Sequence, residues 1–155
     1  MASIEWTHKM SVGVPELDND HKGLLAVINQ LEAHGADEAG QVAVRRSLNW
    51  LLRYAQTHFA REQAVLTQCK YPQLSEHIDE HRDFVNWMKE TIAAFDESPA
   101  RATAETRDDL ITYLENWWRH HILVEDRKYK SCAQENPTQS SRAAREVRGY
   151  DIWWG

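Results

Sequence analysis

The chain has 155 residues, a formal net charge of −6 at pH 7 and 42% hydrophobic residues, which suits one domain with its own core. Its lysines and arginines are scattered, which argues against nucleic-acid binding or a polybasic membrane patch, because both need clustered cations. There is no run of about 20 apolar residues for a membrane span, and the first residues lack the apolar centre of a secretory signal. We therefore expect a cytoplasmic protein without nucleic-acid or membrane partners.

The first 17 residues are expected to form an extended arm over the core, because apolar side chains alternate there around Gly13 and Pro15. After it, apolar residues recur at steps of three and four, which predicts helices. Asp37 and Thr103 are candidate caps for the second and fourth helices, and Gly35 is a typical stop for the first. The four predicted helices span approximately residues 18–35, 37–70, 72–97 and 103–135.

Short connections make neighbouring helices antiparallel, so the predicted fold is all-α, an up-down-up-down four-helix bundle. We expect this bundle, with its arm, to occupy residues 1–136. Residues 137–155 change character, with a polar hinge, a short basic helical piece and a Trp153–Trp154 pair near the end. We treat them as a C-terminal extension whose indoles either pack on the bundle, cap the mouth of a pocket, or contact a partner or a second copy. A monomer is the simplest expectation.

Two cysteines, Cys69 and Cys132, are too few and too far apart in sequence for a disulfide scaffold or a thiolate metal cluster. We interpret both as ordinary thiols. The unusual part of the composition is its 8 histidines and 7 tryptophans. Histidine is the commonest metal ligand in proteins, so its positions on the helices are informative.

Imidazoles and a carboxylate interrupt the apolar stripes of all four predicted helices. Taken alone, His21 or His121 is more often a satisfied core residue than a ligand, His58 with Glu62 suits a surface hydrogen-bonding pair, and His77 with His81 suits a partly exposed patch. Buried together without partners, however, the groups would destabilise the fold by several kcal/mol, so a bound metal is the best explanation for the set. Spacing supports it, because two pairs lie four residues apart on one helix face. The interrupting residues are His21, His58, Glu62, His77, His81 and His121.

The stretch "HHILVEDRKY" adds one carboxylate in an unexpected register. Asp126 follows His121 by five residues, whereas neighbours on a regular helix face lie three or four apart. One extra residue in a turn is a π-bulge, which would return Asp126 to the face of His121. We expect this distortion; the alternative is an aspartate that swings inward from a regular helix.

Five imidazoles and two carboxylates exceed the four ligands of a tetrahedral zinc site. Two metal ions share them better. Sites that are rich in nitrogen and have bridging carboxylates suit iron, whereas manganese prefers more oxygen ligands. The sequence therefore predicts two iron ions, with a bridging oxo or hydroxo group that completes their coordination.

The same residues resemble the hemerythrin family, in particular its single-domain bacterial members. The resemblance covers residues 6 to about 130 and rests on Trp6 and on four motifs: "GVPELDNDH", "HFARE", "YPQLSEHIDEH" and "WWRHHILVEDRKY". It implies that His77, His81 and His121 hold one iron, His21 and His58 hold the other, and Glu62 and Asp126 bridge the pair. It also implies reversible binding of dioxygen at the second iron, for carriage, storage or delivery, without enzymatic turnover.

The resemblance further implies an apolar oxygen pocket without proton donors, lined by Leu24, Phe59, Trp117 and Ile122. One residue departs from the family pattern, because Trp118 stands where leucine is usual, and we expect a tighter or differently gated pocket. The alternative functions are a diiron oxygen or redox sensor and an oxidase that handles peroxide or nitric oxide. His8, His34 and His120 have no matching partners, and we interpret them as surface residues.

Overall fold

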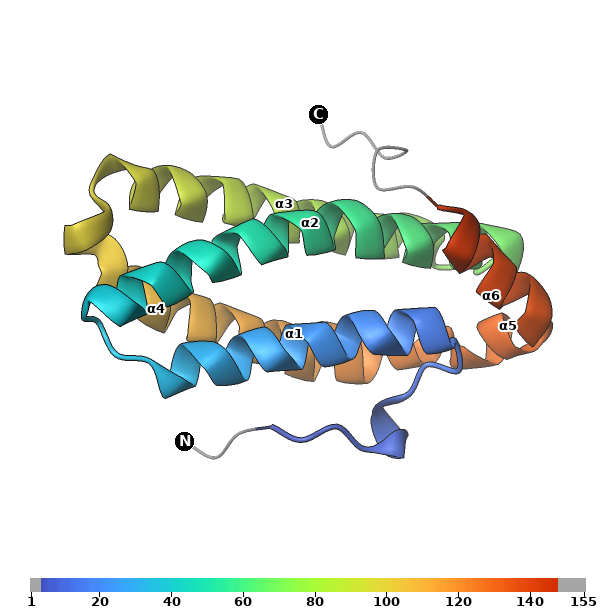
Figure 1. Ribbon diagram of the computed structural model, residues 1–155. Coiled ribbons are helices and arrows are strands. Elements are labelled where there is room, and N and C mark those ends of the chain that lie inside the picture. Colours follow the sequence, from blue (N-terminus) through green and yellow to red (C-terminus); the bar gives the residue numbers. More distant parts are fainter. Residues whose placement is uncertain (1–3, 148–155) are drawn as a thin grey trace.

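The computed structural model describes residues 4–147, and every regular element in this part of the chain is helical (Figure 1). The predicted all-α bundle is thereby confirmed. Four long helices build it: α1 (Pro15–Ala33), α2 (Glu38–Gln68), α3 (Leu74–Glu97) and α4 (Pro99–Asn116). The fourth rod continues beyond α4 as a π-helical segment, Trp117–Asp126, and then as the short helix α5 (Lys130–Gln134).

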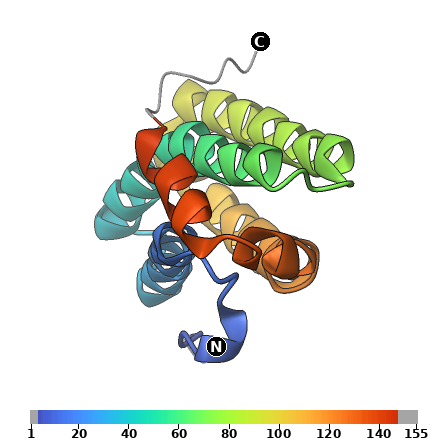
Figure 2. The same ribbon diagram turned by 90° about the vertical axis from the view of Figure 1, so that its right-hand side faces the viewer.

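The helices run alternately up and down in two layers, with α1 and α4 in one and α2 and α3 in the other (Figures 1 and 2). The short connections make consecutive helices antiparallel neighbours, and the bundle closes where α4 also packs on α1 and α2. The apolar stripes meet in a core that includes Leu24, Ile28, Leu51 and Phe84. The polar groups predicted inside the core therefore lie where four rods face one another.

The helix starts agree with the sequence in one case and differ in two. Asp37 caps α2 as expected, since its side chain accepts a hydrogen bond of 3.0 Å from the Gly40 amide. Thr103 is not a cap: the fourth rod begins at Pro99, and the Thr103 hydroxyl donates to the Pro99 carbonyl within α4. The first helix begins at Pro15, inside the expected arm. In both corrected cases proline occupies the first turn, where its fixed φ favours a helix start.

The N-terminal arm lies against α1 and includes a 3-10 turn at His8–Met10, so it is not extended throughout. Asn29 exchanges two hydrogen bonds with the backbone of Ile4. Asp18 accepts hydrogen bonds from the Ser11 hydroxyl and the Val12 amide, at 2.6 and 2.9 Å. These polar contacts fix the path of the arm at both ends.

Gly13 makes the sharp approach of the arm to the bundle possible. Its φ of +83° lies in the region that other residues avoid, and an added Cβ would lie 2.8 Å from the Gln134 side chain. A larger residue would therefore both strain the backbone and push the arm away from α5.

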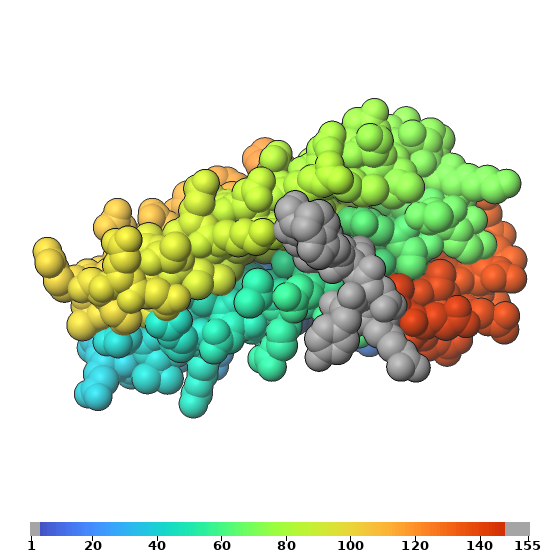
Figure 3. Space-filling model, turned by 90° about the horizontal axis from the view of Figure 1, so that it is seen from above, coloured from blue at the N-terminus to red at the C-terminus, as the bar shows by residue number. Residues whose placement is uncertain are grey.

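After α5, helix α6 (Pro137–Glu146) crosses the end of the bundle and packs on α2 and α1 (Figure 2). In the face seen in Figure 3, α3 and α2 lie side by side and α6 covers the far end of α2. Ser140 and Ala144 form the buried side of α6. The expected basic helical piece is present, whereas the division into bundle and extension at residue 137 stays a prediction. Trp153 and Trp154 lie outside the described residues.

The expectation of two free thiols is wrong. Cys69, at the end of α2, and Cys132, in α5, form a disulfide with their Cα atoms 5.6 Å apart. The two residues are separated by 63 positions, and only the antiparallel return of the fourth rod brings them together. Counting cysteines could not reveal this proximity, because spacing patterns predict pairings only in small scaffolds built on disulfides.

No helix among the described residues has both the length and the apolar character that a membrane crossing requires.

Candidate metal centre

All seven side chains selected from the sequence meet at one level of the bundle. His21 comes from α1, His58 and Glu62 from α2, and His77 and His81 from α3. The π segment adds the remaining two, His121 and Asp126. Each of the seven is at most 4% exposed, so these side chains are almost completely buried. The groups converge because the antiparallel order brings the relevant turn of every rod to the same height.

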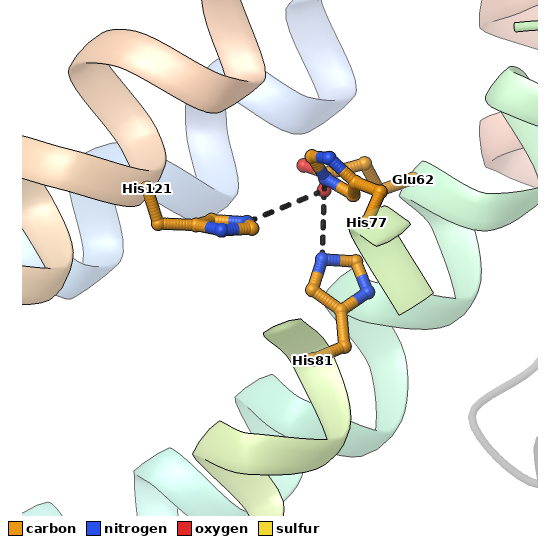
Figure 4. A group of neighbouring side chains, drawn as sticks. All are labelled: Glu62, His77, His81 and His121. Carbon is orange, nitrogen blue, oxygen red and sulfur yellow. Dashed lines mark hydrogen bonds and ion pairs between the residues drawn. The ribbon is translucent and has the colours of Figure 1, made fainter. Parts of the chain in front are cut away.

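Three of these histidines gather around one oxygen of Glu62 (Figure 4). The Nε2 atoms of His77 and His81 lie 2.5 and 2.9 Å from Oε1, and that of His121 lies 3.9 Å away. Oδ1 of Asp126 lies 3.0 Å from the Nε2 atoms of His77 and His121. We call these three histidines the three-histidine group.

The other two histidines face the second oxygen of each carboxylate. Nε2 of His58 lies 3.2 Å from Oε2 of Glu62, and Nε2 of His21 lies 3.2 Å from Oδ2 of Asp126. We call His21 and His58 the two-histidine group. Both carboxylates thus turn one oxygen to each group, which is the arrangement that a bridging ligand requires.

The register of Asp126 is explained by the π-helical segment, which confirms the expected distortion. Residues 117–126 are π-helical over 10 residues, a longer stretch than the single bulged turn that the sequence suggests. In this geometry a step of five residues returns to the same face, so His121 and Asp126 point to the same place. The inward swing from a regular helix is therefore excluded.

Several of these ligand atoms have no hydrogen-bond partner in the described part of the chain. Nε2 of His21 and His121 and both carboxylate oxygens of Asp126 are buried, and hydrogen-bond geometry gives them no partner within residues 4–147. Unsatisfied buried polar atoms are rare in folded proteins and destabilise them. Two cations between the carboxylates would satisfy these atoms, so the residues present fit a pair of metal ions.

The carboxylates supply the negative charge that favours cations here. Burial raises the pKa of Glu62, but the coulombic effect and hydrogen bonds of its histidine neighbours outweigh it and hold the pKa well below its usual range. Burial and the nearby Glu62 raise the pKa of Asp126, yet His121 and His21 lower it more. Both groups are therefore carboxylates at neutral pH, with a combined charge of −2 in a buried cavity.

Without a metal, the histidines respond to these carboxylates unequally. Burial lowers the pKa of His58, but its bonds to Asp20 and Glu62 raise it to about 9. Burial also lowers the pKa of His77, but the nearby Glu62 and Asp126 outweigh burial and raise this pKa to about 9. For His81 burial prevails, helped by the other imidazoles, and lowers the pKa to about 4. The metal-free site thus holds protons where cations would lie.

An outer ring of polar residues orients the imidazoles through Nδ1, and the sequence reading missed it. Asp20 accepts a hydrogen bond of 2.9 Å from His58 and is itself held by Arg61, at 2.7 Å. Glu80 accepts a hydrogen bond from Nδ1 of His121. Such carboxylate partners fix the ring orientation and make Nε2 a better ligand. They lie beside ligands in sequence, but only the packed helices show which imidazole each one meets.

Gln63 and Tyr129 complete this outer ring. The side-chain amide of Gln63 lies 3.0 Å from Nδ1 of His81. The buried Tyr129 hydroxyl donates a hydrogen bond of 3.0 Å to Oε2 of Glu62. Tyr129 follows Asp126 by three residues, a spacing that places both on one helix face, and this spacing is the signal that could have identified it.

The predicted oxygen-pocket residues are all buried, but they divide between the two groups of histidines. Phe59 stacks on His81 and Trp117 on His121, each with ring centroids 3.9 Å apart. Trp118 instead lies beside the two-histidine group, edge-on to His21 at 6.3 Å. Leu24 and Ile122 are fully buried in the same core. Buried aromatic and aliphatic side chains therefore cover part of the polar centre.

Comparison with known proteins agrees with this centre. The model of the family described as "Hemerythrin HHE cation binding domain" matches residues 12–133. The chain belongs to the hemerythrin family. A bacteriohemerythrin of Stenotrophomonas maltophilia is 26% identical over 92% of this chain and 89% of its own length. One of Clostridium acetobutylicum is 26% identical over 80% and 96%, and myohemerythrin-1 of Phascolopsis gouldii is 26% identical over 81% and 90%.

The cation-binding domain of this hemerythrin-family protein thus contains every residue selected as a ligand. Two groups of its buried histidine and carboxylate atoms lie close enough together to hold metal ions, and Glu62 belongs to both. His8, His34 and His120 lie apart from them, with His8 and His120 exposed and His34 half-buried.

Proposed function

We propose that this protein binds dioxygen reversibly at a non-haem diiron centre, as a carrier, store or delivery protein and not as an enzyme. The observation that carries the proposal is the unequal division of imidazoles around two shared carboxylates. In the proposed site, His77, His81, His121, Glu62 and Asp126 would hold one iron. His21, His58 and the same two carboxylates would hold the other. A bridging oxo or hydroxo group would complete the coordination of the pair. The iron held by His21 and His58 would have one protein ligand fewer than the other, which leaves room there for dioxygen.

When bound, the two ferrous ions would supply the two electrons that dioxygen needs for reversible capture. The protein's own contribution is to keep the site dry. Leu24, Trp118 and Ile122 are buried next to the histidines, and their side chains carry no acidic proton. Their burial limits the access of water and protons to the centre, which is the condition for reversible binding.

Tyr129 is the polar group that most needs an explanation in this setting. Burial raises its pKa well above the usual value, and the carboxylates beside it add to the effect. Its proton stays on the phenol and is shared with Oε2 of Glu62. Tyr129 therefore orients a carboxylate and does not act as an acid.

The test is an anaerobic titration of the metal-free protein with ferrous ion, followed by air and then by vacuum. Two ions per chain and a visible absorption band that appears in air and disappears under vacuum support the proposal. Irreversible conversion in air, with catalytic consumption of oxygen, peroxide or nitric oxide, would favour an oxidase. A change in protease sensitivity of residues 137–155 on oxygenation would favour a sensor. A monomeric state and a cytoplasmic location stay predictions.

A further inference from the structure

A column of stacked aromatic rings runs along α2 from the surface to the metal centre. The Trp50 indole stacks on the Tyr54 phenol, with ring centroids 5.2 Å apart and planes inclined by 21°. Tyr54 stacks in turn on the His58 imidazole, at 4.8 Å and 10°. The three residues are spaced by four along the helix, so each ring lies one turn beyond the last. The inner end of the column is a proposed iron ligand, and the outer end is half-exposed.

Two hollows on the surface meet at this outer end. One, of about 310 Å³, is lined by Val27, Arg46, Trp50 and Arg53, among others. The other, of about 300 Å³, shares Trp50 and Arg53 and reaches Tyr54 and His58. Together they form a groove between α1 and α2 whose floor is the aromatic column. The groove thus leads from solvent to the edge of a metal-binding imidazole.

The groove is positively charged, in contrast to the chain as a whole. Arg46, Arg53 and Arg61 line it, and among the described residues neither Arg46 nor Arg53 has an ion pair. The acidic residue that lines it, Asp20, is neutralised by Arg61 and His58. Because the net charge is −6, an acidic partner is repelled elsewhere and attracted here.

Close packing against Gly23 holds the Trp50 indole, the outermost member of the aromatic column, in a fixed position. This glycine lies in the middle of α1, a position where glycine destabilises a helix relative to alanine. A Cβ added to it would lie 2.7 Å from Cζ2 of Trp50. The missing side chain is therefore what lets the indole pack flat against α1 while it stacks on Tyr54.

We propose that this groove is the docking surface for an acidic one-electron carrier protein, and that Trp50, Tyr54 and His58 conduct its electrons to the diiron centre. The inference rests on the proposed function, because iron that has been oxidised in air must be reduced before it binds dioxygen again. Each transfer moves one electron, so that the carrier is oxidised and one ferric ion becomes ferrous. Two transfers restore the pair.

The carrier is a protein because the unpaired charges are spread along the groove. Arg46 and Arg53 are seven residues apart on one helix, a span of about 10 Å at 1.5 Å per residue. A small anion would contact only one of these arginines at a time. The Tyr54 hydroxyl is buried, and no described side chain accepts a hydrogen bond from it. Because no base among residues 4–147 lies within hydrogen-bond distance to take its proton on oxidation, the phenol serves as a bridge for tunnelling.

The test follows reduction of the ferric protein by a reduced plant-type ferredoxin, used as the acidic carrier, in a stopped-flow instrument. Trp50→Leu should lose the fast phase of reduction, Trp50→Phe should keep most of it, and Gly23→Ala should slow it by displacing the indole. Reversible oxygen binding by all three variants should match the parent, because none of them changes a ligand. Trp87→Leu, a half-buried indole on α3, is the matched control.

Docking is measured separately from electron transfer, by calorimetry of oxidised ferredoxin with the ferric protein. The Arg46→Gln, Arg53→Gln double variant should weaken binding by about tenfold or more at low salt, and high salt should abolish the difference.

Fast reduction that persists in Trp50→Leu would overturn the route. Binding that is equal in the arginine variant would overturn the docking surface. Either result would leave oxygen binding intact and so be distinguishable from failure of the proposed function.

Discussion

The phenol of Tyr129 and the carboxylate of Glu62 are joined by a buried hydrogen bond of 3.0 Å, which links the fourth rod to the residue shared by both metal positions. Tyr129→Phe removes only the donor. Loss of such an outer partner commonly weakens a metal site by about tenfold to a hundredfold. We expect a decrease in that range in metal affinity, measured by competition with a chelator. Tyr113→Phe, outside the centre, should leave the affinity unchanged.

Glu62 should matter more to metal content than any single histidine, because one of its oxygens faces each group. We expect Glu62→Gln to lose metal from both positions. His81→Gln should lower occupancy only in the three-histidine group and leave about one ion per chain, as estimated from the ligand sharing. Elemental analysis of purified variants checks the ratio. Full occupancy in Glu62→Gln would show that the carboxylate does not bridge.

The Cys69–Cys132 disulfide should contribute substantially to stability because it closes a long loop. For a sequence separation of 63 residues, the chain-entropy relation gives about 4 kcal/mol as an upper value. We expect a dithiol reductant to lower the melting temperature of the parent and to leave the Cys69→Ser, Cys132→Ser variant unaffected. Equal melting with and without reductant in the parent would show that the bond contributes nothing.

Trp118 should control access to the two-histidine group. Its indole is 1% exposed and lies between His21 and the arm residue Trp6. Trp118→Leu would open space beside the proposed oxygen position, so we expect faster oxygen association and faster autoxidation. Both rates can be followed by visible absorption after rapid mixing. If neither rate changes, the indole does not gate the pocket; Trp87→Leu is the control for the loss of an indole.

The metal-free protein should lose stability as pH rises. The pKa of His58 and that of His77 are raised from 6.5 to about 9 in the folded state. Their protons therefore stabilise the fold fully below pH 6.5, and this contribution is lost as pH rises through 9. Denaturant unfolding of chelator-treated protein should show the decline, whereas metal-loaded protein should not, since metal ligands carry no such proton. A flat profile without metal would contradict the assignment.

Sequence patterns predicted most of the fold because each helix carries its own periodicity and local stop signals. The metal centre was also predictable, since buried imidazoles and carboxylates are costly enough to be informative wherever they interrupt an apolar stripe. Even the π segment had a local sign, in the five-residue step from His121 to Asp126. These features depend on residues that are close together along one helix.

Contacts between distant segments were not predictable. The pairing of Cys69 with Cys132, the bond from Glu80 to His121 and the stacking of Trp50 against α1 at Gly23 all depend on how helices are rotated and offset in the bundle. A single sequence carries no record of those rotations. The start of the fourth rod at Pro99 was missed for a different reason, because Thr103 is an equally good local signal four residues later.

The N-terminal arm covers the two-histidine group from outside the bundle through Trp6 and Trp118. Trp6 closes over Trp118 from outside the bundle, and the arm that carries it is tied down by the side chains of Asn29 and Asp18. A short strap of this kind frays far more often than a helix core unfolds. The rate at which dioxygen reaches the two-histidine group would then be set by local opening of the N-terminal arm. Amide hydrogen exchange at Ile4 and Val12 would report the same opening.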